Sequence, residues 1–130
     1  MNSKIILTTS SVVFFAFGIL TSFAPEILLS FLKIEYTLTA TLVAQAFGAF
    51  NIAMGILNWM SKSSLFGGIY NRPIGMANLA YFFMAGLAII KGLLNVPEAP
   101  LFIWGVGIIY LAFAIAFWLL LFKNPIPNNK

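Results

Sequence analysis

Four long apolar stretches, separated by short polar segments, form the main pattern of hydrophobic and polar positions in this chain. They cover residues 5–23, 38–60, 71–94 and 101–122. Each is close to the ~20 apolar residues that an α-helix needs to cross the ~30 Å hydrocarbon core of a bilayer. The pattern therefore predicts an all-α, integral membrane four-helix bundle in which residues 1–130 form a single transmembrane domain.

The segment after the first stretch predicts a short additional helix at residues 25–34. Pro25 and Glu26 suit the first turn of a helix. The apolar positions of the segment share one side of that helix: Ile27, Leu28, Phe31 and Ile34. A helix lying in the membrane interface fits this pattern. An ordinary ordered connection explains it equally well.

The first stretch also has the features of a secretory signal peptide. Lys4 would be its charged start, and Ser22-Phe23-Ala24 would place small residues around a cleavage site. Pro25 would then follow the cut directly, which disfavours cleavage. We therefore expect this stretch to be retained as the first membrane span.

The second stretch carries a face of small and amide-bearing residues. Alternating steps of four and three residues, which keep one helix face turned toward its neighbours, connect Thr37, Thr41, Ala44, Gly48, Asn51, Gly55 and Asn58. In lipid, small residues let helix backbones approach closely, and buried amides need hydrogen-bonding partners. We therefore expect this helix to be the central one, with helix packing at Ala44, Gly48 and Gly55.

The third stretch repeats part of this pattern. The same spacing of Asn, Gly and Asn occurs at Asn51, Gly55 and Asn58 and again at Asn71, Gly75 and Asn78. In an antiparallel hairpin of these helices, Asn58 lies near the level of Asn71. By the same register, Asn51 lies near the level of Asn78, and Gln45 lies deeper in the bilayer. The glycines permit close contact, so the amides are expected to line a polar seam in the cytoplasmic half.

Two interpretations of this polar seam stay open. Amides pair across membrane helices simply as glue, at ~0.6 kcal/mol each. Five amides are more than packing requires, however, and such a seam is also suited to binding a ligand or passing a small solute. The residues expected to bind such a ligand or solute are Gln45, Asn51, Asn58, Asn71, Arg72 and Asn78.

Arg72 stands at the expected start of the third helix, between a plausible N-cap, Asn71, and a first-turn proline, Pro73. A cation at this end opposes the helix dipole and needs a compensating partner. Backbone N–H groups and a guanidinium together suit an anion, such as a lipid phosphate or an anionic substrate. The alternative is a positive-inside anchor that reaches the headgroups. An anionic lipid headgroup satisfies both interpretations.

The few charged residues predict the orientation in the membrane. Four spans place both termini and the middle loop on one side, which then carries Lys4, Lys62, Arg72, Lys123 and Lys130. The opposite side carries Lys33 and Lys91 with all three acidic residues, Glu26, Glu35 and Glu98. Positive charge accumulates on the cytoplasmic side, so the N- and C-termini are expected to be cytoplasmic. The expected location is a cell membrane, with several passes, and the bacterial inner membrane in particular.

Composition supports a membrane protein and removes most catalytic chemistry. The chain is 62% hydrophobic and only 8% charged, against roughly 25% charged residues in a soluble domain. It contains no Cys, His or Asp, so one chain cannot build a disulfide, an imidazole or thiolate metal site, or a Ser-His-Asp triad. We expect no catalytic residue, no metal and no cofactor. The basic residues are scattered singly, which argues against nucleic acid.

The layout resembles that of small bacterial DoxX-like membrane proteins. The resemblance rests on four spans in about 130 residues, cytoplasmic termini and the Gly- and Asn-bearing second helix AQAFGAFNIAMGILNW. It implies the four-helix membrane architecture. It implies little chemistry, and it transfers no functional residue to this chain.

The first functional interpretation is a non-enzymatic membrane protein that binds or conducts a small polar solute or a lipid headgroup through the polar seam. The alternative is an accessory subunit or assembly factor that docks another membrane protein. The expected partner is such a membrane protein or further copies of this chain. A ligand-binding bundle should contain an internal polar pocket. An accessory subunit should have paired amides and a Gly/Ala face exposed to lipid.

Overall fold

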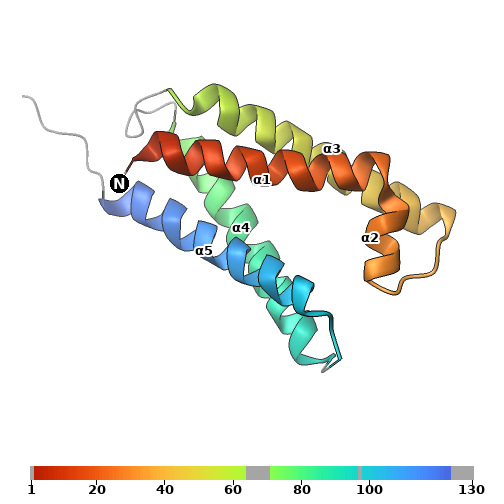
Figure 1. Cartoon of the computed structure of the whole chain (residues 1–130). Helices are drawn as coiled ribbons and strands as arrows, with labels where there is room; N and C mark the ends of the chain where they lie inside the picture. The colour runs from red at the N-terminus through yellow and green to blue at the C-terminus, as the bar shows by residue number, and fades with distance from the viewer. Residues whose placement is uncertain (1, 64–70, 97, 124–130) are drawn as a thin grey trace, which may run out of the picture. The chain divides into compact units, whose positions relative to one another are not determined.

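The computed structural model describes residues 2–63, 71–96 and 98–123. In these residues it contains five helices and no strand: α1 (Ser3–Phe23), α2 (Pro25–Phe31), α3 (Leu38–Ser61), α4 (Arg72–Leu94) and α5 (Leu101–Lys123) (Figure 1). Four of them, all except α2, are long and apolar enough to cross a membrane. The predicted all-α fold is therefore confirmed, together with four helices that are long and apolar enough to cross a membrane.

The chain divides into two compact units, and each is described by itself. One unit comprises Leu7–Lys62, with most of α1 and all of α2 and α3. The other comprises Ser63–Lys130 together with Met1–Ile6, and its long helices are α4 and α5. The expectation of a single transmembrane domain stays a prediction.

Local capping explains where α3 begins. Thr37 has an extended backbone, and its hydroxyl oxygen accepts a hydrogen bond from the Ala40 N–H at 3.1 Å. The Thr37 carbonyl also accepts the first backbone bond of the helix, from the Thr41 N–H at 2.9 Å. Both bonds satisfy groups that a helix start otherwise leaves without a partner, which matters most where water is scarce.

α2 is shorter than the helix expected at residues 25–34, because a hydrogen-bonded cap ends it at Phe31. The Ile34 N–H donates to the Leu29 carbonyl at 2.9 Å. The Lys33 N–H donates to the Ser30 carbonyl at 3.1 Å. These are the two bonds of a Schellman motif, and Lys33 adopts the left-handed conformation, φ 54°, that this ending requires.

α2 contacts α3 and uses a side that the apolar pattern did not single out. Leu29 is buried, together with Pro25 at the start of the helix. Ile27 and Phe31, which belong to the expected apolar face, are exposed. The helix therefore packs on α3 through Leu29 and leaves a second apolar side that a membrane interface would cover.

α4 begins one residue after its expected start, and its N-cap is the predicted residue, Asn71. The Asn71 carbonyl accepts a hydrogen bond from the Gly75 N–H at 3.1 Å. Pro73 in the first turn has no N–H that would need an acceptor. Asn71 is therefore the N-cap residue, as predicted, although its side chain makes no capping hydrogen bond.

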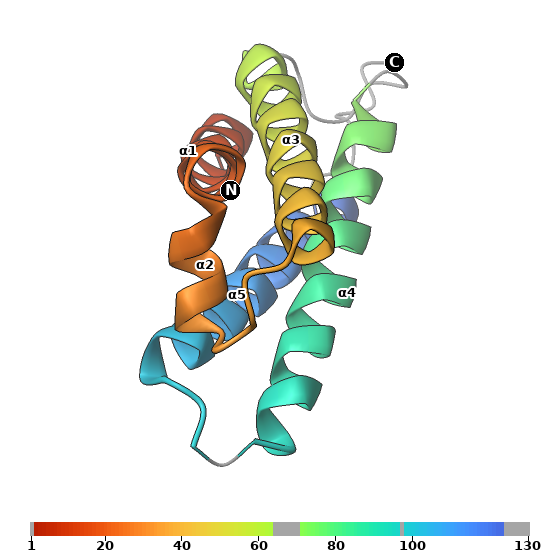
Figure 2. The same cartoon turned by 90° about the vertical axis from the view of Figure 1, so that its right-hand side faces the viewer.

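α4 and α5 form an antiparallel hairpin (Figures 1 and 2). Its core is aromatic. Phe82 is fully buried at its centre. Its ring stacks on Phe113 with a centroid distance of 4.9 Å and on Phe117 at 5.9 Å, and it meets Tyr110 edge-on at 5.3 Å. These offset and edge-to-face arrangements are the favoured geometries of aromatic pairs.

Candidate functional site: the small and polar faces of the membrane helices

The small face predicted on α3 packs against α1. A Cβ atom at Gly48 would lie 2.6 Å from Thr21 Oγ1 and 2.7 Å from the backbone nitrogen of Ser22, and it would also meet Ser22 Oγ. Real Cβ atoms essentially never come within 3.0 Å of another heavy atom. Gly48 is therefore required for the close approach of the α1 and α3 backbones.

The same close contact continues along the two helices toward the C-terminal end of α3. A Cβ atom at Gly18 would lie 2.9 Å from the Ile52 backbone nitrogen. One turn further, the Ser11 hydroxyl donates a hydrogen bond to the Gly55 carbonyl at 2.8 Å. Ser11 is fully buried, so this bond ties a side chain of α1 to the backbone of α3 away from solvent.

Asn58 makes the clearest side-chain bond between these helices. Its Nδ2 donates to Ser10 Oγ at 2.9 Å, and the Ser10 hydroxyl donates in turn to the Leu7 carbonyl at 3.1 Å. Both Asn58 and Ser10 are completely buried. An amide buried in a membrane helix is therefore satisfied by the neighbouring helix, as the glue interpretation of the seam requires.

Asn51 of α3 and Asn78 of α4 are also completely buried. The Nδ2 of Asn51 donates to the Phe47 carbonyl at 2.7 Å, and the Nδ2 of Asn78 donates to the Ile74 carbonyl at 2.9 Å. Both amides have further interactions as well. The two asparagines belong to different units, so their alignment across an α3–α4 seam stays a prediction.

The glycine and alanine positions predicted for packing are all buried: Ala44, Gly48 and Gly55 on α3 and Gly75 on α4. At Gly55, a Cβ atom would lie 3.2 Å from the Phe15 ring of α1. The periodicity of the sequence thus identified the inward face of α3, and the structure adds that α1 is its partner.

Gln45 lies outside the buried part of this face. The residue is exposed, and its Nε2 donates to the Ser22 carbonyl of α1 over a long 3.5 Å. Ser22 Oγ is buried and has no hydrogen-bond partner among the described residues. The hydrogen-bonding groups of the α1–α3 contact are therefore less completely paired around Ser22 than around Asn58.

The outward side of α3 also carries small residues. Ala46, Ala49 and Ala53 are exposed at steps of three and four residues, directly opposite the face that contacts α1. Neither α1 nor α2 covers them. Within this unit, α3 thus carries small residues on two sides, and α1 contacts only one of them.

The predicted anion site is only partly described. Arg72 is the first residue of α4 and is exposed. Lys62, expected nearby, places its Nζ 2.9 Å from the centre of the Trp59 ring, in a cation–π contact. Because tryptophan and lysine are typical of the membrane–water boundary, this pair fits the end of a span.

Tyr81 and Tyr110, whose hydroxyls need partners within a span, contact each other. Their hydroxyl oxygens lie 3.4 Å apart across α4 and α5. Among the described residues, no group of three or more His, Cys, Asp or Glu side chains could hold a metal ion. The polar groups that the structure brings together are amides and hydroxyls, which can bind and orient but do not titrate near neutral pH.

The polar face of α1 was missed in the sequence. Ser11, Gly18 and Ser22 follow steps of seven and four residues, the same rhythm as on α3. This spacing of small and polar residues can be found in the sequence. Hydropathy alone does not reveal it, because bulky apolar residues stand between these positions.

Comparison with protein-family profiles, with curated proteins and with solved structures finds no match to this chain. The resemblance to DoxX-like proteins stays a prediction.

Proposed function

We propose that this protein is a non-catalytic accessory subunit or assembly factor that docks another membrane protein through the outward face of α3. The observation that carries the proposal is the exposed stripe of Ala46, Ala49 and Ala53. Lipid tails gain little from small side chains, whereas a second helix can approach closely over them. The inward face of the same helix demonstrates that geometry with α1.

The exposed amide of Gln45 supports the same proposal. Gln45 lies beside this stripe and within a candidate membrane span. An amide that faces hydrocarbon loses its hydrogen bonds to water, so a polar group on a docked helix stabilises it. The long bond to Ser22 leaves room for such a partner because it is near the limit of hydrogen-bonding distance.

The absence of native cysteine makes this proposal direct to test. In native membranes, a single cysteine in Ala49→Cys should form a cross-link to a membrane protein that copurifies in stoichiometric amount. Val43→Cys, exposed on the flank of α3, is the matched control and should not. Ala49→Leu with Ala53→Leu should release the chain from the complex on gentle extraction. Extraction of the unaltered chain as a monomer would contradict the proposal.

A second candidate function is the binding or conduction of a small polar solute or lipid headgroup through the polar seam. It is supported by the complete burial of Asn51, Asn58 and Asn78 within candidate spans. Arg72, exposed at the start of α4, would meet an anionic headgroup. This candidate needs α3 and α4 to share the seam, and the docking proposal does not.

Phosphatidylglycerol is a suitable probe for this second candidate. Asn51→Leu and Asn78→Leu should each abolish its retention in native mass spectrometry while membrane insertion stays intact. Arg72→Gln should weaken retention by removing the charge. Asn95→Leu, at an exposed position after α4, is the matched control and should change nothing. Retention that survives both seam substitutions rules the seam out as the binding site.

The proposed orientation places both termini in the cytoplasm, in a bacterial inner membrane. It rests on the distribution of the basic residues and on the positive-inside rule. A single cysteine in Asn2→Cys should react with an impermeant reagent only from the cytoplasmic side. A single cysteine in Glu98→Cys should react only from the outside. The reverse labelling would invert the topology.

A further inference from the structure

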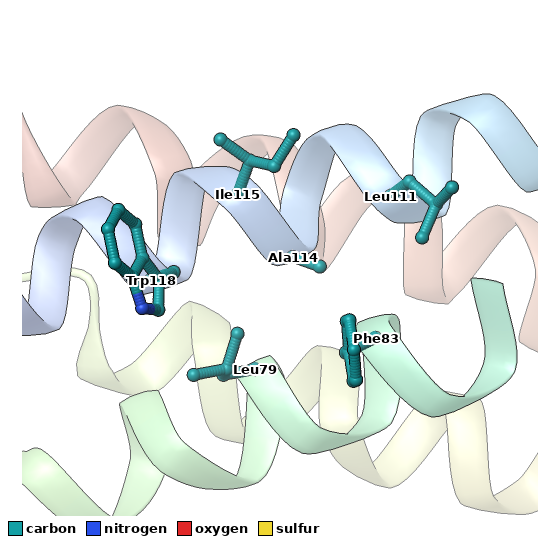
Figure 3. A pocket seen from close by; sticks show the side chains of 6 residues that line it. All are labelled: Leu79, Phe83, Leu111, Ala114, Ile115 and Trp118. Atoms are coloured by element: carbon teal, nitrogen blue, oxygen red, sulfur yellow. The ribbon is translucent and has the colours of Figure 1, made fainter. Parts of the chain in front are cut away.

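An apolar groove runs along the surface of the α4–α5 hairpin. Its volume is about 300 Å³, and it is lined by Leu79 and Phe83 of α4 and by Leu111, Ala114, Ile115 and Trp118 of α5 (Figure 3). Both helices are candidate membrane spans. The groove therefore opens within a region where hydrocarbon is the solvent.

The groove exists because one residue on its floor is small. Ala114 is buried, whereas Phe83, Ile115 and Trp118 at the rim are about half exposed. The aromatic core fills the space between the helices on the other side of Ala114, through Phe82 and its neighbours. On the groove side, no side chain replaces the volume that a larger residue at position 114 would occupy.

The two ends of the groove are held in place by packing. At the deeper end, Leu111 rests on Gly86 of α4, where a Cβ atom would lie 2.9 Å from its Cδ2. At the other end, the indole of Trp118 contacts the Phe122 ring with a centroid distance of 5.9 Å. α5 ends at Lys123, ~7.5 Å beyond Trp118 at 1.5 Å per residue. The groove thus leads from near the end of the span toward the middle of the membrane.

The size and chemistry of the groove select its occupant. A transmembrane helix is ~10–12 Å wide with its side chains, too wide for a groove of this volume. Water and polar solutes find no hydrogen-bonding groups along the six side chains except the indole N–H of Trp118. A single hydrocarbon chain is narrow and apolar, and it enters lengthwise from the interface.

We propose that this groove is a specific site for one acyl chain of a phospholipid, with the headgroup at the Trp118 end. A phospholipid is favoured because its headgroup remains at the interface, where the groove begins and where Trp118 can donate a hydrogen bond to an ester or phosphate oxygen. The site is independent of the docking face on α3. It can therefore hold whether or not that proposal does.

The test uses the fluorescence of Trp118 alone, in a background with Trp59→Phe and Trp104→Phe. The protein is reconstituted in vesicles of phosphatidylglycerol with brominated acyl chains, which quench nearby indoles. It is then extracted into lipid-free detergent and separated from excess lipid. We expect quenching of Trp118 to persist, because the chain in the groove is retained. Loss of all quenching on extraction would overturn the proposal.

Three substitutions show whether retention depends on the groove. Ala114→Leu fills the floor and should abolish the persistent quenching. Ala112→Leu adds the same volume on an exposed part of α5 outside the groove and should leave the quenching unchanged. Leu79→Phe narrows the groove from α4 without adding a second indole, and it should also abolish the quenching. This second variant guards against a folding defect at position 114. Equal quenching in all these variants would overturn the proposal.

A final comparison identifies the source of the chain. After delipidation, the protein is incubated with brominated phosphatidylglycerol or with a brominated free fatty acid. Quenching that returns with the phospholipid supports the proposal. Quenching that returns only with the fatty acid overturns the assignment to a phospholipid.

Discussion

α1 and α3 meet through glycine, serine and asparagine, whereas α4 and α5 meet through phenylalanine and tyrosine. In the first pair, Gly48 brings two backbones almost into contact, and Asn58 and Ser10 form a buried hydrogen bond. In the second pair, the ring of Phe82 fills the space between the helices and stacks on Phe113. Both pairs consist of candidate membrane spans.

This difference shows two ways to join helices where the hydrophobic effect gives no driving force. Lipid tails are as apolar as a leucine side chain, so association depends on van der Waals contact and on hydrogen bonds. Glycine gives contact by removing side chains and exposing backbone acceptors such as the Gly55 carbonyl. Aromatic rings give contact by filling space. The stability of a glycine contact is therefore sensitive to added side-chain volume. The stability of an aromatic contact is sensitive to lost side-chain volume.

The largest expected effect is the loss of volume in the aromatic core. Phe82→Ala should destabilise the α4–α5 hairpin by about 3 kcal/mol, the lower end of the range for Phe→Ala, because the transfer part is small in lipid. The measurement is unfolding in SDS, followed by Trp118 fluorescence. Met84→Ala, at an exposed position on the same helix, is the control and should change the stability by under ~0.5 kcal/mol. A loss for Phe82→Ala no larger than that of the control would show that the rings do not hold this pair.

The next effect is the gain of volume in the glycine contact. Gly48→Ala should destabilise the α1–α3 pair by ~1–3 kcal/mol, because the new methyl group meets the backbone of Ser22. Trp59 fluorescence on α3 reports the transition. Gly105→Ala is the matched control: no atom lies within 4 Å of its would-be Cβ, and helix propensity should stabilise by ~0.5–1 kcal/mol. Effects of the same sign at both glycines would contradict the close packing at Gly48.

The smallest effect distinguishes the hydrogen bonds of the two regions. A double-mutant cycle with Ser10→Ala and Asn58→Ala should give a coupling of about 0.6 kcal/mol, with ~1.7 as the upper limit for such bonds in membranes. The cycle with Tyr81→Phe and Tyr110→Phe should give a smaller coupling, since their oxygens are 3.4 Å apart. A tyrosine coupling that exceeds the serine–asparagine coupling would reverse the comparison.

The sequence predicted the inward face of α3 but not its partner. Steps of three and four residues place Gly48, Gly55 and Asn58 on one side of any helix, and all are buried. Whether that side faces α1 or another helix depends on contacts between residues far apart in the chain. The bond from Asn58 to Ser10 could not be inferred from a pattern within either segment.

Two further features depended on structure for the same reason. The pairing of the Tyr81 and Tyr110 hydroxyls follows from the register of α4 against α5. The early end of α2 follows from the left-handed conformation of Lys33, a residue type that does not signal a helix end as glycine does. Neither feature has a distinctive signature in the residues themselves.

The sequence by itself predicted an all-α chain with four helices long and apolar enough to cross a membrane, and the structure contains those helices. Those properties depend on local composition, because ~20 apolar residues without charge are stable as a helix in a bilayer whatever their neighbours. The tertiary structure decided which small face of α3 contacts α1 and where the small side chain of Ala114 leaves a groove between α4 and α5. Those properties depend on how side-chain volumes fit between helices, and no single helix contains that information.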